Sequence, residues 1–259
     1  MKNKKLGPDF FVIGMQKAGT AWAYDSMKSH PNFFMPVVKE IHHYDSSEPE
    51  MNIMRSESRD IERANYKLLK ARNPQKKKRL RKFVSYLEDG RRYKDYTKLF
   101  SRQKHLFSGD VTPAYSAFDT DKISQIRDNH PNAKIILIIR EPVSRLWSAF
   151  NMYVRMLLRE DGLNSLDEAN QQLFYDRATL ENLKKYLEIP GVIRRSYPSH
   201  IYQRWLNIFE DERLEVIFFD DLVTQPQNVW FNVEQFITGN IRTKVFHPAD
   251  NRKSTQHKI

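Results

Sequence analysis

Residues 10–20 read FFVIGMQKAGT, an apolar run that leads into a turn with two glycines, a lysine and a threonine. The pattern predicts a buried strand, a tight turn and the start of a helix. Backbone N–H groups at a helix N-terminus, the helix dipole and a nearby lysine together bind phosphate groups. A Walker A loop has its lysine directly after the second glycine, whereas Lys17 precedes Gly19 here. The segment therefore predicts a phosphate-binding loop that differs from that of nucleoside triphosphatases.

Residues 133–148 read AKIILIIREPVSRLWS and predict a second strand, turn and helix. The apolar run ends at Arg140, and Pro142 falls in the first turn of a helix, where proline is well tolerated. Ser148 follows on the same helix, about two turns beyond Arg140. Arginine presents a planar fork of donors that suits phosphate, and serine adds a hydroxyl donor. This segment therefore predicts a second phosphate-binding position.

Two further segments lie between these, KEIHHYD at residues 39–45 and SGDVTPAY at residues 108–115. In this order, over residues 9–239, the four segments resemble the sulfotransferases that use 3′-phosphoadenosine 5′-phosphosulfate (PAPS). They are most similar to the heparan-sulfate-type branch, which has K-E-P-H-F-F-D and G-E-K-T/S-P-x-Y at the middle positions. The resemblance implies that the first loop binds the 5′-phosphosulfate and that the last segment binds the 3′-phosphate. No metal is required if lysine and backbone donors supply the positive charge.

The resemblance implies a set of cofactor-binding residues. Lys17 is expected beside the 5′-phosphate, on the side of the leaving group. Arg145 lies between the two residues expected at the 3′-phosphate and would face either that phosphate or Glu141. The full set of expected cofactor-binding residues is Lys17, Ala18, Gly19, Thr20, Ala21, Arg140 and Ser148.

The resemblance also implies four catalytic residues, Lys17, Glu40, His42 and Asp45. Glu40 is expected to be the general base that takes the proton of the acceptor. His42 is the rival base, because a neutral imidazole titrates near pH 6.5. The expected role of His42 is instead to polarise or orient, with Asp45 fixing its ring. Glu40 could instead serve only as an ion-pair partner of Lys39.

Two positions depart from the family pattern. His43 stands where the family has an aromatic residue, and adjacent histidines also allow a metal site, although no third ligand lies nearby at metal spacing. Val111 replaces a lysine that lies near the acceptor in relatives. Beyond the resembling region, the basic residues 251–254 would either close over the cofactor or form a frayed tail.

Predicted strands and helices alternate along the chain, which indicates an α/β, three-layer phosphate-loop-type fold with a central parallel sheet flanked by helices. Strands are predicted at 9–14, 32–36, 106–109, 134–139 and 214–219. Helices are predicted at 20–29, 60–100 with two breaks, 120–129, 143–158, 164–187 with a capping box at its start, 198–209 and 228–237. Residues 45–59 are predicted to form a loop or lid. Lys17, Glu40, Asp110 and Arg140 follow strands, so they should converge on one cleft. Residues 1–259 are expected to form a single domain with a basic helical insertion around residues 55–104.

The 259 residues carry a formal net charge of +11, which points to anionic partners. Much of this charge lies in residues 67–104, which suit a solvated helix face, a docking surface for an acidic acceptor or a nucleic-acid site. No nucleic-acid motif accompanies the run, so the expected partners are PAPS or its product PAP and an acidic glycan or carrier protein. Cysteine is absent, which excludes disulfides and thiolate chemistry. No apolar run approaches the ~18 residues of a membrane span, and no secretory signal is evident. A soluble, cytoplasmic protein is expected.

The leading hypothesis is sulfuryl transfer from PAPS to a hydroxyl or amine, with a glycan as the family-weighted acceptor. A carrier-bound acyl chain, a lipid or a small alcohol remains open as acceptor. A nucleotide or small-molecule kinase would need Mg²⁺ ligands and a triphosphate site that the sequence lacks. A non-catalytic polyanion-binding protein would bind in a salt-sensitive way that survives loss of Lys17.

Overall fold

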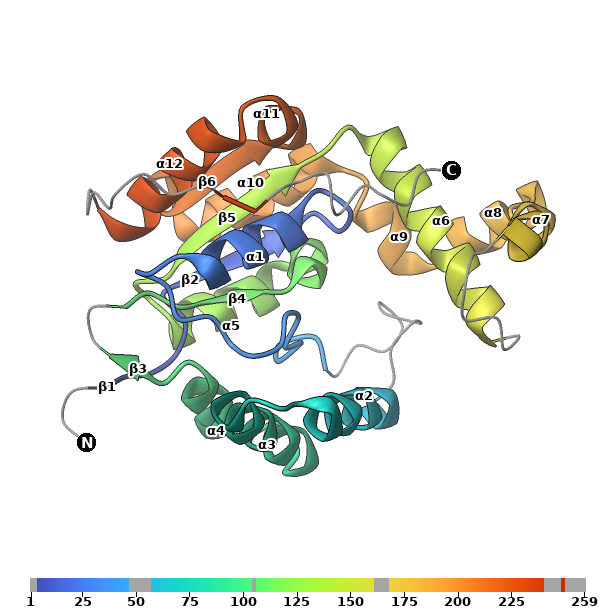
Figure 1. Cartoon of the computed structure of the whole chain (residues 1–259). Coiled ribbons are helices and arrows are strands. Elements are labelled where there is room, and N and C mark those ends of the chain that lie inside the picture. The colour runs from blue at the N-terminus through green and yellow to red at the C-terminus, as the bar shows by residue number, and fades with distance from the viewer. Residues whose placement is uncertain (1–3, 47–56, 104–105, 161–167, 240–247, 250–259) are drawn as a thin grey trace.

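The computed structural model describes residues 4–46, 57–103, 106–160, 168–239 and 248–249. Its centre is a four-stranded parallel sheet with the strand order β4-β2-β5-β6 (Figure 1). The strands are β2 (Phe10–Gly14), β4 (Gly109–Val111), β5 (Lys134–Ile139) and β6 (Leu214–Phe218). Helices flank the sheet, so the predicted α/β fold with a central parallel sheet is confirmed.

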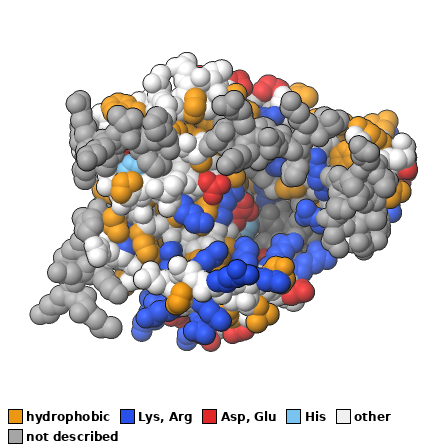
Figure 2. Space-filling model, viewed as in Figure 1, with side chains coloured by type: hydrophobic (Ala, Val, Ile, Leu, Met, Phe, Trp, Pro, Cys, Tyr) orange, Lys and Arg blue, Asp and Glu red, His pale blue; other side chains and the backbone are white. Residues whose placement is uncertain are grey.

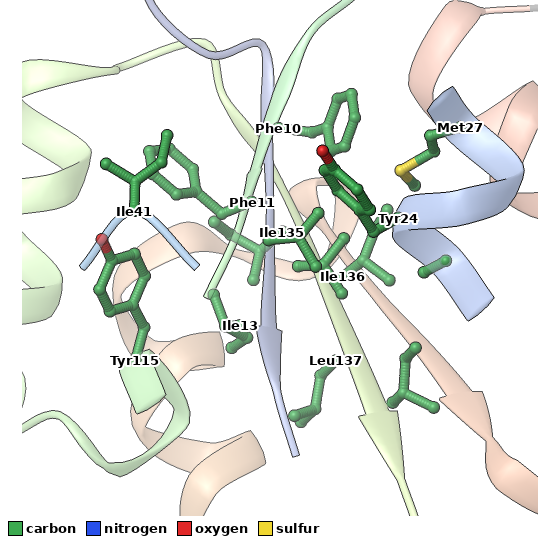
Figure 3. Packing of buried hydrophobic residues seen from close by; sticks show 14 of the residues in the cluster. Phe10, Phe11, Ile13, Tyr24, Met27, Ile41, Tyr115, Ile135, Ile136 and Leu137 are labelled. Carbon is green, nitrogen blue, oxygen red and sulfur yellow. The ribbon is translucent and has the colours of Figure 1, made fainter. Parts of the chain in front are cut away.

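Alternate residues of β2 point to opposite faces of the sheet, as strand geometry requires. The ring of Phe10 meets Phe33 edge-on at 5.8 Å between centroids, and Phe33 in turn lies 5.9 Å from Trp230. Phe11 points to the other face, where its ring lies 6.4 Å from that of Tyr115. Both faces are covered, which explains why β2 and β5 read as continuous apolar runs (Figure 3).

Helices follow the strands along the chain. Outside the insertion they are α1 (Thr20–Ser29), α5 (Thr120–Asn129), α6 (Pro142–Glu160), α7 (Glu168–Arg177), α8 (Leu180–Leu187), α9 (Pro190–Arg194), α10 (Pro198–Phe209), α11 (Phe219–Thr224) and α12 (Pro226–Thr238). Trp22 of α1 and Trp230 of α12 meet edge-on at 6.3 Å, which joins these helices on one face. Helices α6 to α9 follow one another along the chain (Figure 1), and residues from them, including Phe150 and Tyr186, form a second small core.

The predicted basic insertion forms three helices, α2 (Glu57–Lys70), α3 (Pro74–Glu88) and α4 (Tyr93–Leu99). Asn73 caps α3 by accepting a hydrogen bond from the backbone of Lys76 at 3.0 Å. Arg91, which is buried, ties the insertion to the rest of the molecule: it pairs with Asp60 at 2.8 Å and donates to the carbonyl oxygen of Ile41 at 3.2 Å. A short antiparallel pair, β1 (Lys4–Lys5) and β3 (Arg102–Gln103), lies beside it.

Two predicted strands were wrong. Residues 32–36 form no strand, because Phe33 makes only an isolated bridge with Phe107 and Pro36 lacks an N–H for a ladder. The strand predicted at 106–109 lies instead at Gly109–Val111, so Asp110 lies within β4 and does not follow it.

The helix predicted over 164–187 is interrupted. Thr179 starts α8 by accepting a hydrogen bond from the backbone of Asn182 at 3.2 Å. The predicted capping box at residues 165–168, most of the predicted loop at 45–59 and the basic residues 251–254 lie outside the described residues.

Candidate active site

The turn after β2 is suited to an anion. Gly19 is the N-cap of α1 with φ of 97°, and α1 has no side-chain cap and no acidic residue in its first turn. Its first N–H groups therefore keep their capacity to bind an anion. Ala18 and Thr20 are buried here, and Ala21 is half-buried. Gly14 precedes the turn at φ of 150°, and a Cβ there would lie 2.7 Å from the Cβ of Ser116, so the close approach requires glycine.

Arg140 lies directly against this turn. Its Nη1 donates to the carbonyl oxygen of Lys17 at 3.0 Å, and its guanidinium lies 4.5 Å from the ring centroid of Phe219. Strands β2 and β5 are neighbours in the sheet, although the chain forms β4 between them. Their carboxyl ends therefore form a topological switch point, where α/β sheets bind their ligands. The structure thus brings Lys17 and Arg140 together.

The other polar residues of the second segment, Glu141, Arg145 and Ser148, lie at the start of α6 or within it. Ser148 is half-buried on α6, and its hydroxyl has no hydrogen-bond partner among the described residues. Arg145 is fully buried, and its Nη2 donates to Ser196 Oγ at 2.6 Å. Glu141 caps α6 by accepting from the backbone of Ser144 at 2.6 Å. Arg145 therefore packs within the molecule and does not pair with Glu141.

Residues 39–45 form a chain of polar contacts beside the turn. Lys39 Nζ lies 3.3 Å from Thr20 Oγ1, at the start of α1, and 2.7 Å from Glu40 Oε1. The second oxygen of Glu40, Oε2, is 3.5 Å from His42 Nε2. Nδ1 of the same ring lies 2.6 Å from Oδ2 of Asp45, which is buried. The three residues predicted from the KEIHHYD segment therefore lie in one line with the turn after β2, residues 15–19, which is the predicted phosphate-binding turn.

Charges in this line shift two pKa values. Burial raises the pKa of Glu40, but the hydrogen bond from His42 and the charge of Lys39 outweigh it and lower that pKa to about 2. Burial and the nearby charge of Arg155, followed by those of two other cations, lower the pKa of Lys17. The site therefore holds an ionised glutamate next to crowded cations, an arrangement that favours an anionic ligand.

A buried network of hydrogen bonds and stacked rings, which the sequence did not reveal, supports residues 39–45. Tyr115 Oη accepts a hydrogen bond from the backbone N–H of His43 at 3.0 Å and donates to Asp110 Oδ2 at 3.1 Å. The ring of His43 stacks on Tyr96 at 4.1 Å and 9°, and its Nδ1 lies 2.9 Å from Tyr86 Oη. The loop is thereby fixed to both the insertion and the sheet. The available signal was the cluster of tyrosines in residues 86–96.

Asp110 is the centre of this network. It is fully buried and accepts hydrogen bonds from Thr112 Oγ1 at 2.7 Å and Tyr96 Oη at 2.8 Å, in addition to Tyr115. Burial raises the pKa of Asp110 to about 6, although these hydroxyl donors oppose the rise. Asp110 therefore supports the loop and does not reach the cleft.

A cleft of about 870 Å³ opens at the carboxyl end of the sheet. Lys17, Glu40 and His42 line it, together with residues of α2, α3, α6 and α9. Figure 2 shows a hollow on this face that is bordered by Lys and Arg side chains. An acceptor that enters the cleft would therefore meet the 39–45 loop and the phosphate-binding turn together.

Among the described residues, no group of three or more His, Asp or Glu side chains is placed to hold a metal ion. No helix within the described ranges is long and apolar enough to cross a membrane.

The fold and the site together are those of an α/β protein with a cleft suited to an anionic ligand at the carboxyl edge of its sheet. Residues 8–238 match the model of the sulfotransferase family, and the chain belongs to that family. A stretch of 129 residues, 49% of this chain, is 30% identical to human heparan sulfate glucosamine 3-O-sulfotransferase 5 and 29% identical to the mouse protein of that name. The match spans about a third of those relatives, 35% of their length.

Solved structures show the same fold. A sulfotransferase from Alicyclobacillus acidocaldarius superposes with a TM-score of 0.52 at 19% identity, over 96% of this chain and 89% of that one. The sulfotransferase domain from the curacin biosynthetic pathway gives a TM-score of 0.55 at 16% identity, over 93% of this chain and 76% of that one. At these identities the likeness concerns the fold.

Proposed function

We propose that this protein transfers the sulfuryl group of PAPS to a hydroxyl or amine of an acceptor. One observation carries the proposal: in a chain of the sulfotransferase family, an uncapped helix N-terminus, Lys17 and Arg140 converge where a cleft exposes Glu40. The donor set of the turn fits a phosphate, since it combines backbone N–H groups, a lysine and an arginine fork.

Each group has a distinct task in this proposal. When bound, PAPS supplies an activated sulfuryl group on its 5′-phosphate. Lys17 and the first N–H groups of α1 hold that phosphate and neutralise the charge that grows on it as its bond to sulfur breaks. Arg140 pairs with the 3′-phosphate. Glu40 accepts the proton of the acceptor as the acceptor atom bonds to sulfur.

Lys39 links the two halves of the site. The ammonium of Lys39 contacts both Glu40 and Thr20. An anion bound at the start of α1 therefore competes with Glu40 for the Lys39 ammonium. Weaker pairing with Lys39 raises the pKa of Glu40 above about 2 and makes it a better base. His42, held by Asp45, keeps the carboxylate pointed along the loop.

A comparison of turnover with cofactor binding tests these roles. Glu40→Gln should lower turnover by about 100-fold or more, the usual contribution of a general base, while the affinity for PAP stays near that of the wild type. Lys17→Ala should lower both. Glu88→Gln, which removes an exposed carboxylate of α3, is the matched control and should change neither. Loss of PAP binding in Glu40→Gln, or retained turnover, would remove Glu40 from the role of base.

The acceptor stays open among the classes foreseen from the sequence. A glycan is one candidate, and its support is that heparan sulfate glucosamine appears in the names of the curated relatives. A carrier-bound acyl chain, a lipid or a small alcohol is the second.

A further inference from the structure

The described walls of the active-site cleft are cationic and apolar at once. They carry nine basic side chains against two carboxylates, Glu40 and Asp60. Both carboxylates are already paired, Glu40 with Lys39 at 2.7 Å and Asp60 with Arg91 at 2.8 Å. The remaining positive charge exceeds what the phosphate-binding turn requires, so the acceptor half of the cleft is itself electropositive.

Much of this excess lies on α2. Arg59, Arg63 and Lys67 are spaced four residues apart, line the cleft and are exposed. Side chains at this spacing lie on one face of a helix, roughly 5–6 Å apart. Arg63 and Lys67 form no ion pair with any residue in the described ranges. Like charges at this spacing destabilise a helix, so a bound anion would relieve a repulsion within α2.

Helix α6 contributes a different surface. Met152 and Met156 lie one turn apart, line the same cleft and are half-buried. Val38 and Ile189, from two other segments, extend this apolar lining. Methionine is flexible and polarisable and adapts to apolar ligands of irregular shape. The cleft therefore offers an apolar wall for a chain as well as cations for an anionic group.

The hydrogen-bonding inventory argues against a sugar acceptor. A glycan presents many hydroxyl groups, and each O–H needs an acceptor when it is buried. Lysine and arginine only donate. Among the described lining residues, Gln16, His42 and Tyr186 are the hydrogen-bonding side chains other than Lys, Arg and the two paired carboxylates, and no serine, threonine or asparagine is present. Few sugar O–H groups would therefore find a side-chain acceptor in this cleft.

We infer that the acceptor is an amphiphilic anion: a phosphate ester joined to an apolar chain that carries the hydroxyl or amine to be sulfated. Its phosphate rests on Arg59, Arg63 and Lys67, and its chain lies along Met152 and Met156. The inference rests on the proposed function, because it assigns the acceptor half of the same site. An acidic polysaccharide would contact only the basic residues of α2. The inferred ligand also contacts the apolar wall formed by Met152 and Met156.

Calorimetry with octyl phosphate, below its critical micelle concentration, tests the inference. Saturating PAP is present throughout, so that the phosphate-binding turn is blocked. Octyl phosphate should bind at least about tenfold more tightly than inorganic phosphate, octyl glucoside or tetragalacturonate, because only octyl phosphate meets both surfaces. Equal affinities, or tighter binding of tetragalacturonate, would overturn the inference.

Matched variants locate the binding. Arg63→Gln should lower the affinity for octyl phosphate about threefold, which is the scale of one exposed charge pair. Arg81→Gln changes an exposed residue of α3 outside the cleft and should leave this affinity unchanged. Met156→Gln should lower the affinity for octyl phosphate, whereas Leu69→Gln, which changes an exposed residue outside the cleft, should leave it unchanged. Equal effects within either pair would place the ligand elsewhere and contradict the inference.

Two further arms separate the possible outcomes. Cosedimentation with phosphatidylglycerol vesicles would identify a lipid as the source of the phosphate ester, and octyl phosphate binding without cosedimentation would identify a water-soluble ester. If PAP itself fails to bind, the proposed function fails. If PAP binds and octyl phosphate does not, only the present inference fails.

Discussion

Lys17, Glu40 and His42 share a left-handed backbone conformation, with φ of 69°, 61° and 56°. Non-glycine residues rarely adopt it, and such strain tends to gather where a ligand site requires a fixed geometry. Hydrogen bonds hold these positions: the backbone N–H of Glu40 donates to the Val111 carbonyl oxygen at 3.1 Å. Val111 stands where the family has a lysine. Its backbone carbonyl nevertheless supports Glu40.

Removal of Lys39 should change the pH dependence of turnover. Lys39 lowers the pKa of Glu40, so Lys39→Met should raise it and shift the acidic limb of kcat/KM to higher pH. Lys39→Arg, which keeps the charge, should leave the limb close to its wild-type position. The wild-type limb lies below pH 4, because the pKa of Glu40 is about 2, so the measurement is a pH profile of kcat/KM from pH 3 to pH 8 in which Lys39→Met should lose activity on the acid side before the other two proteins do. An acidic limb that does not move in Lys39→Met would show that Glu40 is not the titrating base.

His43 should contribute to acid sensitivity. Burial and the charge of His130 lower the pKa of His43 to about 4 from 6.5. A histidine with a lowered pKa contributes stability that is present above its unfolded pKa and is lost as the pH falls toward the folded value. Between pH 6.5 and pH 4, His43→Phe, which keeps the stacking on Tyr96, should therefore lose less stability than the wild type, by at most about 3 kcal/mol. Urea unfolding at pH 7 and pH 4.5 measures this difference, and equal losses in both proteins would contradict the assignment.

At the scale of elements, the helices and strands predicted most accurately are those whose first and last residues are marked by a local sequence signal. The bounds of α1, α5, β5 and α10 are those predicted, because Gly19, Asp119 and Pro198 mark helix starts and the β5 run is apolar throughout. The short helices α9 and α11 escaped prediction, since five or six residues carry too little periodic pattern.

The residues proposed for the site could be named from the sequence, whereas the contacts that support them could not. Lys17, Glu40 and Arg140 stand in segments with a recognisable pattern. The network of Asp110, Tyr96 and His43 depends on contacts between residues up to 53 positions apart (Tyr96 with His43), which no local pattern reports. The placement of Arg145 likewise depends on Ser196, 51 residues further along.

The packing of β4 against β2 should depend on Gly109. A Cβ there would lie 2.1 Å from the ring of Phe10, which is fully buried, so Gly109→Ala should destabilise by about 3 kcal/mol, the cost of overpacking a core. Gly90→Ala is the control. It has φ of 75° and open space around it, so it should cost only about 1 kcal/mol for the strained backbone. Urea unfolding at neutral pH compares the two, and similar losses would show that the β4–β2 contact is looser than described.

At the scale of the whole molecule, the protein is strongly positive, and several of its cations crowd together at the cleft. With a net charge of +11 and crowded cations at the cleft, the ligand-free protein is destabilised by self-repulsion at that site. PAP should therefore raise the thermal unfolding midpoint. At 100 times its Kd a ligand adds about 2.7 kcal/mol, which corresponds to about 5–10 °C for a chain of this size. Lys17→Ala should reduce the shift, and an undiminished shift would place PAP outside the phosphate-binding turn.

The most direct test is calorimetric titration of PAP, with 5′-AMP and Mg·ATP as controls, on the wild type and on Arg140→Ala. We expect micromolar binding of PAP, weaker binding of 5′-AMP, and a loss of about 10–100-fold in PAP affinity in Arg140→Ala, the contribution of a charge-assisted phosphate contact. Equal binding of PAP and 5′-AMP, or tighter binding of Mg·ATP, would contradict a PAPS site between β2 and β5.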